Sequence, residues 1–228
     1  KQKTAYEIVS RDWSSDVCSS DLTGTPSLST SAMNNSGAGT YDITPSLGSL
    51  SAANYDFNFV NGVFTINKAL LTITAEKKNR IYGAANPLFT ATATGFVNGD
   101  DLFSGAFSGK AAMATTAIGS SAPGNYPITI SIGTLTSSNY NFTFVGNTLT
   151  ISKAPVTVIA DNKTRPYGSN NPTLTWSYDG LMNGETAATC DITGAANIAT
   201  SATSKSSVGV YAITIANGSL SSVNYTLS

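Results

Sequence analysis

The sequence has no histidine, few charged residues and no long apolar segment, and each absence excludes a class of function. Because histidine is missing from all 228 residues, the chain cannot form Ser-His-Asp or Cys-His nucleophile systems or the common histidine zinc sites. Only 11% of the residues are charged, with a net charge of -1, so no basic cluster attracts nucleic acid or anionic lipid. No run of about 18 apolar residues is present to cross a membrane. We therefore expect no enzyme, no cofactor, no nucleic-acid partner and no membrane insertion.

Small polar residues dominate what remains. Serine, threonine and asparagine are abundant, and glycine occurs 20 times. Apolar residues make up 41% of the chain, which is the normal share for a protein with packed cores. Low charge together with many hydroxyl and amide side chains is typical of secreted, strand-rich surface proteins.

Most of the chain is built from a repeat of 85 residues. The tyrosines Tyr41, Tyr126 and Tyr211 lie 85 residues apart, and each follows a glycine by two positions. The front half repeats at the same offset, since residues 73–100 align with residues 158–185 without a gap. A fixed period of this length indicates an array of similar modules.

The repeat predicts a division of the chain into four parts. Residues 70–154 form a complete module, residues 23–69 are the C-terminal part of a truncated module, and residues 155–228 form a module that lacks its last strand. We expect such a chain to be a fragment of a longer array. Residues 1–22 do not fit the repeat and resemble a translated sequencing-library adapter, so we expect a non-native, disordered segment.

Alternation of apolar and polar residues predicts strands within each module. It places six side chains of the complete module on one buried face: Leu71, Ile73, Ile128, Phe142, Phe144 and Ile151. Asn-Gly and Asn-Pro turns separate the segments. The predicted fold is all-β, with tandem small β-sandwich modules that are loosely immunoglobulin-like. The alternative is a β-grasp module with one short helix within residues 103–116.

The connections between modules are short. Residues 67–69 and 152–154 are all that separates the last strand of one module from the first strand of the next. Connections of this length favour a stiff string of modules over a flexibly linked one.

Several short motifs recur in successive modules. The complete module carries Tyr82-Gly83-Ala84, Asn86-Pro87, Gly124-Asn125-Tyr126 and Leu149-Thr150-Ile151, and the next carries Tyr167-Gly168-Ser169, Asn171-Pro172 and Gly209-Val210-Tyr211. In these motifs residues 23–228 resemble the MBG domain of the YGX type, a repeated module of large bacterial surface and secreted proteins. The resemblance implies an extracellular repeat of adhesin-like proteins, and it transfers no catalytic residue.

One turn offers several oxygen atoms to a metal ion. The sequence Asn98-Gly99-Asp100-Asp101 resembles the flexible, oxygen-rich loops that bind Ca²⁺. The equivalent turn, Asn183-Gly184-Glu185-Thr186, has one carboxylate fewer, and a repeated ligand set would repeat. We therefore expect a β-turn in which Asn and Gly adopt positive φ, and no metal site.

Trp176 and Tyr178 are the candidate binding residues, because the matching positions of the complete module are Ala91 and Ala93. Two large rings on one strand face would suit sugar stacking, but they would equally fill core volume. The GxY tyrosines are expected to pack inward and to tie their hydroxyls to a nearby loop. Cys190 has only Cys18 as a disulfide partner, and we expect a free thiol.

The predicted function is structural. We expect a stalk or spacer region of a secreted or cell-surface bacterial adhesin-like protein, in which each module contacts its neighbours. The alternative is that the modules themselves bind host or environmental glycans or surface proteins. In either case the expected location is outside the bacterial cell.

Overall fold

The computed structural model describes residues 22–228, and this part of the chain is all β. Of the predicted foreign segment 1–22, only Leu22 lies within the described residues. The 103–116 stretch, where the β-grasp alternative placed a helix, forms turns and a strand, so that alternative is not needed. No helix among the described residues is long and apolar enough to span a membrane.

The strands fall into three groups that follow the repeat. The first repeat contains β1 (Leu22–Thr23), β2 (Ser27–Thr30), β3 (Gly39–Ser46), β4 (Ser51–Ala52) and β5 (Gly62–Ile66). The second repeat contains β6 (Ala69–Ala75), β7 (Lys78–Ile81), β8 (Ala91–Thr94), β9 (Ala112–Thr115), β10 (Gly124–Ser131), β11 (Tyr140–Val145) and β12 (Asn147–Ser152). The third repeat contains β13 (Ala154–Ala160), β14 (Trp176–Asp179), β15 (Asn197–Thr200), β16 (Ile213–Ala216) and β17 (Tyr225–Leu227).

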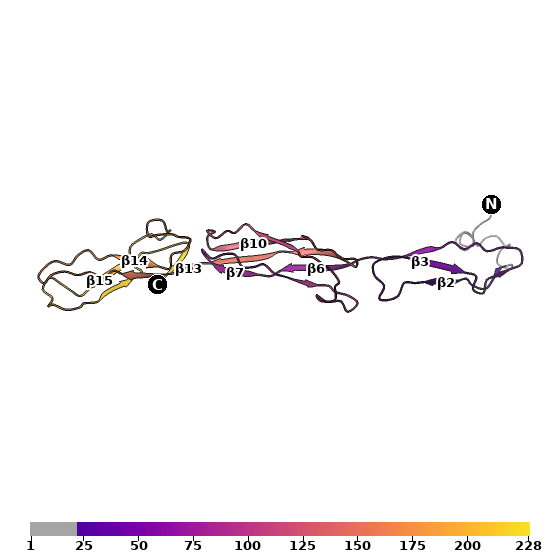
Figure 1. The fold of residues 1–228 in the computed structure, drawn as a ribbon, viewed down its shortest axis with the longest axis horizontal. Coiled ribbons are helices and arrows are strands. Elements are labelled where there is room, and N and C mark those ends of the chain that lie inside the picture. The colour runs from indigo at the N-terminus through magenta and orange to yellow at the C-terminus, as the bar shows by residue number, and fades with distance from the viewer. Residues whose placement is uncertain (1–21) are drawn as a thin grey trace. The chain divides into compact units, whose positions relative to one another are not determined.

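The second repeat has the two sheets of the predicted β-sandwich. One sheet has the strand order β7-β12-β10-β9 and the other has the order β11-β6-β8. Figure 1 labels β7 and β10 of the first sheet and β6 of the second. In the first sheet β12 pairs antiparallel with β10 and parallel with β7. The closing strand β12 therefore lies in the middle of its sheet, and β7 reaches that sheet only through it.

The predicted alternation of buried and exposed residues is confirmed in the second repeat. Leu71, Ile73, Ile128 and Ile151 are buried, whereas Phe142 and Phe144 are half-buried. Leu149 of β12 is also fully buried. The core of this repeat therefore forms on the face that the sequence pattern indicates.

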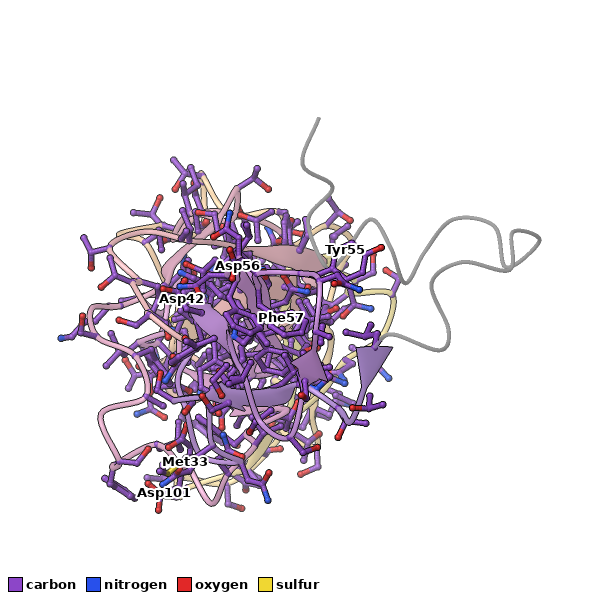
Figure 2. All side chains as sticks on the ribbon, turned by 90° about the vertical axis from the view of Figure 1, so that its right-hand side faces the viewer. Met33, Asp42, Tyr55, Asp56, Phe57 and Asp101 are labelled. Carbon is purple, nitrogen blue, oxygen red and sulfur yellow. The ribbon has the colours of Figure 1, made fainter. Side chains whose placement is uncertain are left out.

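The first repeat is less buried than the second, and the third repeat has fewer paired strands than the second. No side chain described in residues 22–69 is fully buried. Met33, Asp42 and Asp56 are exposed, whereas Phe57, which lies toward the middle of the view in Figure 2, is half-buried. In the third repeat β16 pairs only with β15, while its counterpart β10 pairs with both β9 and β12. Val208 and Val210, which precede β16, are exposed.

The chain divides into two compact units, and the boundary between them passes through the second repeat. The first unit contains, of the described residues, 22–71, Gly95–Gly109 and Leu135–Thr143. The second contains Thr72–Thr94, Lys110–Thr134 and Phe144–Ser228. The second unit thus joins part of the second repeat to the whole of the third, and it contains the junction between them.

Candidate functional site

The connections between repeats are as short as the sequence predicts, and both are held by the same hydrogen bonds. Only Lys153 separates β12 from β13. In the second unit the N–H of Ala154 donates to the carbonyl oxygen of Asn224 at 3.0 Å, and Lys153 Nζ donates to the carbonyl oxygen of Ser222 at 2.6 Å. In the first unit, Ala69 and Lys68 make the equivalent bonds to Asn139 and Ser137 at 2.9 and 2.7 Å.

At the junction between the second and third repeats, the second repeat contributes a loop built around Arg80. Arg80 is buried, and its Nε donates to Asn86 Oδ1 at 2.7 Å while its Nη2 donates to the carbonyl oxygen of Ile118 at 2.5 Å. Gly83 follows Tyr82 with φ of +78°, in the left-handed region that favours glycine. The guanidinium thus fixes the loop that presents the Tyr82-Gly83 pair.

The third repeat contributes a tight turn. The central residues, Asn183 and Gly184, have φ of 55° and 71°, and the N–H of Glu185 donates to the carbonyl oxygen of Met182 at 2.9 Å. Two consecutive positive φ values are the pattern of a type I′ turn. The prediction of a turn with unusual φ is therefore confirmed for this segment, and Asn98 has the same conformation in the second repeat.

The loop and the turn meet at the carboxylate of Glu185. The hydroxyl of Tyr82 donates to Glu185 Oε1 at 2.5 Å, and the hydroxyl of Tyr225 donates to Oε2 at 2.8 Å. Tyr225 Oη accepts in turn from the N–H of Met182 at 3.0 Å, and the two tyrosine rings meet edge to face at 5.5 Å between centroids. A single carboxylate therefore bridges one buried tyrosine from each repeat.

The apolar core continues through the junction. One cluster of buried side chains contains Ala75, Tyr82, Ala117, Ile128, Leu149 and Ile151 of the second repeat together with Ala154 and Val156 of β13 and Tyr225 of β17. Leu181, Met182 and Ile192 of the third repeat pack against it. Burial of apolar surface contributes about 25 cal/mol per Å², so the cluster stabilises the junction as well as each repeat.

Burial and the shared carboxylate raise the pKa of both tyrosines at the junction. Burial, reinforced by the hydrogen bond to Glu185, raises the pKa of Tyr225 to about 12. The hydrogen bond to Glu185, together with burial, raises the pKa of Tyr82. Both tyrosines therefore stay protonated, and remain donors to the carboxylate, above the pH at which an ordinary tyrosine ionises.

The raised pKa of Tyr225 makes the junction sensitive to alkali. A group whose pKa is raised on folding contributes stability that is complete below its unfolded pKa and is lost as the pH rises through its folded pKa. We expect the free energy of unfolding of the third repeat to fall by about 1.4 kcal/mol per pH unit between pH 10 and 12. Urea unfolding followed by Trp176 fluorescence in a Trp13→Phe background measures it. An equally steep fall in the Tyr225→Phe variant would contradict this origin.

Asn224 carries a buried polar atom that has no hydrogen-bond partner among the described residues. Its Oδ1 accepts no hydrogen bond, whereas Oδ1 of the equivalent Asn139 accepts one from the N–H of Ala38 at 2.9 Å. The residue equivalent to Ala38 is Pro123, and proline has no N–H to donate. The sequence difference at one position therefore explains the unsatisfied amide.

Restoring the missing donor is expected to stabilise the junction. In Pro123→Ala the new N–H can donate to Asn224 Oδ1, a bond that contributes roughly 0.5–1.5 kcal/mol, partly offset by about 0.4–1 kcal/mol from the more flexible unfolded chain. The Asn224→Ala background isolates the bond, because there the same proline substitution has only the unfavourable effect. Urea unfolding of the four chains gives the coupling, and a coupling of zero would contradict the assignment.

The predicted binding residues lie on one face of β14. Both Trp176 and Tyr178 are half-buried, and Trp176 Nε1 donates to Tyr178 Oη at 3.0 Å. Tyr178 packs against the core cluster. The two rings are thus in contact with each other, and one of them is in contact with the core.

The other residues that the sequence singled out have structural contacts. Tyr41, Tyr126 and Tyr211 each donate their hydroxyl to the carbonyl oxygen four residues earlier, at 2.8, 2.9 and 3.0 Å, which confirms the predicted tie to a nearby loop. Tyr41 and Tyr126 are half-buried, but Tyr211 is exposed, so the predicted inward packing is wrong for Tyr211. The carboxylate of Asp100, in the turn for which a β-turn was expected in place of a calcium site, accepts from the hydroxyl of Tyr140 at 2.7 Å. Cys190 is a free thiol that packs against the core cluster.

Sequence reasoning missed the junction itself. Tyr82 and Glu185 were both visible as parts of repeated motifs, but they are 103 residues apart and were considered only within their own repeats. The available signal was that the Tyr-Gly pair and the acid after Asn-Gly recur together in both repeats.

These features define a tandem array of small β-sandwich modules whose contacts continue from one module to the next. The family model of the MBG domain (YGX type) matches residues 8–65, 71–150 and 156–228, and the chain belongs to this family. None of the curated proteins and none of the solved structures matches the chain. Membership of the family supports a repeat region of a surface protein.

Proposed function

We propose that the chain is a stalk or spacer region of a bacterial cell-surface or secreted adhesin-like protein. The observation that carries this proposal is the core cluster that runs from the second repeat into the third. A junction with its own buried core resists bending, whereas repeats joined by a flexible linker would move independently. A stalk needs this property because it must hold another domain at a distance.

The contacts of the junction also suit an array of variable length. The Lys and Ala hydrogen bonds recur at both connections, so each added repeat brings the residues for its own attachment. In repeat proteins each unit contacts only its neighbours, and length grows without new chemistry. The Tyr-Gly loop and the acidic turn therefore have a role in assembly, and we propose no enzymatic role for the chain.

The alternative function is direct binding of glycans or surface proteins by the modules, through Trp176 and Tyr178. The hydrogen bond from Trp176 to Tyr178 and the packing of Tyr178 against the core favour a structural role for both rings. We therefore rank binding second, and we place partners other than neighbouring repeats outside this part of the protein.

Two measurements on the full chain separate these functions. For a spacer, inserting one and then two copies of residues 70–154 after Ala154 should raise the maximum dimension in small-angle X-ray scattering by equal increments. The chain should also bind neither mucin nor a glycan array. Glycan binding that is lost in Trp176→Ala, with an unchanged circular dichroism spectrum, would favour the binding function. A maximum dimension that does not grow with the insertions would contradict the spacer.

A further inference from the structure

The third repeat has its own copy of the loop that forms the junction. Arg165 Nε donates to Asn171 Oδ1 at 2.7 Å, its Nη2 donates to the carbonyl oxygen of Thr203, and Asn171 Nδ2 donates to the carbonyl oxygen of Ala202 at 2.6 Å. These bonds match those of Arg80 and Asn86 position for position at the 85-residue offset. The loop thus adopts the same shape although no neighbouring repeat among residues 22–228 covers it.

The face that this loop presents is open. Tyr167 is 70% exposed, whereas its counterpart Tyr82 is 4% exposed. Gly168 has φ of +79° and no atom within 4 Å of the place of a Cβ, whereas a Cβ on Gly83 would lie 2.3 Å from Met182 Cβ. The chain therefore contains two copies of this surface. The third repeat covers the copy around Tyr82 and Gly83, and the copy around Tyr167 and Gly168 is exposed.

We propose that the face around Tyr167 and Gly168 is a docking face for a further repeat in the same chain. The occupied copy of the face specifies the chemistry of the occupant: an Asn-Gly turn with two positive φ values, an apolar residue before it, and an acid after it that accepts the tyrosine hydroxyl. In this chain both Met182-Asn183-Gly184-Glu185 and Val97-Asn98-Gly99-Asp100 have that form. The proposal goes beyond the spacer role, because such a face would dock a repeat whether the array spaces or binds.

Two elements added after Ser228 would cover Tyr167: a closing strand and a further repeat. In the second repeat the N–H of Tyr82 donates to the carbonyl oxygen of Ser152 at 2.8 Å, so the end of the closing strand also reaches the tyrosine. The hydroxyl and the neighbouring glycine are covered by the next repeat, through Glu185 and Met182. A test must therefore separate the strand from the repeat.

Extending the full chain after Ser228 provides this separation. Ser228 corresponds to Thr143, so a copy of residues 144–154 supplies the closing strand alone, and a copy of residues 144–228 supplies the strand and a further repeat in register. The readout is the rate of nitration of Tyr167 relative to Tyr82, measured by mass spectrometry, with the tyrosine of the long extension that copies Tyr167 replaced by phenylalanine so that only one such peptide contains tyrosine. We expect a roughly tenfold fall with the long extension, comparable to the difference between 70% and 4% exposure, and a much smaller fall with the short one.

A matched substitution gives a second readout. Gly168→Ala has free space in the present chain, and with the long extension it should restore the nitration of Tyr167 because the new Cβ meets the docked turn. With the short extension it should change nothing. Equal nitration in all chains, or full protection by the strand alone, would overturn the proposal. Protection that rises with concentration in the unextended chain would assign the face to a second copy and would also overturn it.

Discussion

Replacing Gly83 by alanine is expected to destabilise the compact unit that contains this loop and the third repeat by about 2–5 kcal/mol. The new Cβ would lie 2.3 Å from Met182 Cβ, and overpacking of this kind costs typically 1–3 kcal/mol. The φ of +78° adds roughly 1–2 kcal/mol for any residue with a Cβ. Urea unfolding followed by Trp176 fluorescence, with Trp13 replaced by phenylalanine, measures the change in the third repeat.

Gly168 is the matched control for this substitution. Its φ of +79° is nearly identical, but nothing lies within 4 Å of its Cβ position. Gly168→Ala should therefore show only the backbone cost, about 1–2 kcal/mol. If the two substitutions destabilise the third repeat equally, the contact between Gly83 and Met182 has no energetic role, and the account of the junction is wrong.

Removing the carboxylate of Glu185 is expected to cost about 2–6 kcal/mol. Glu185→Ala leaves the hydroxyls of Tyr82 and Tyr225 without the acceptor that each now has, and a buried donor without a partner costs roughly 1–3 kcal/mol. The loss affects both repeats, because one of the two tyrosines belongs to each. The same fluorescence-detected unfolding gives the value for the third repeat.

A double-mutant cycle tests whether the bridge itself is responsible. Combining Glu185→Ala with Tyr82→Phe should give a coupling of about 1–3 kcal/mol, because both substitutions remove the same hydrogen bond. Combining Glu185→Ala with Tyr167→Phe should give a coupling near zero, because Tyr167 is exposed. Equal coupling in the two cycles would show that the effect is not transmitted through the junction.

The fold of each repeat follows from local patterns in the sequence. Alternation in residues 71–75 placed Leu71 and Ile73 on the buried face, where they are found, because the side chains of a strand point to its two faces in turn. The Asn-Gly turn was also predictable, since few other residue pairs tolerate two positive φ values. Both features are decided by residues that are close together in the chain.

The junction depends on contacts that no local pattern specifies. An offset of 85 residues shows that Tyr82 and Tyr167 are equivalent, but it does not show which neighbour covers Tyr82. That depends on the fit of Met182 over a residue without a Cβ, which is a property of two packed surfaces. The unsatisfied Oδ1 of Asn224 is similar, because Pro123 matters only once the two segments are known to meet.

We expect the junction to hold the third repeat rigidly against the part of the second repeat in the same compact unit. Spin labels on cysteines at the exposed positions Thr129 and Thr214, in a background with Cys18→Ser and Cys190→Ala, measure the distance across it by pulsed electron paramagnetic resonance. We expect one narrow distance distribution that broadens in Gly83→Ala and stays narrow in Gly168→Ala. A broad distribution in the chain with an unaltered junction would contradict the account.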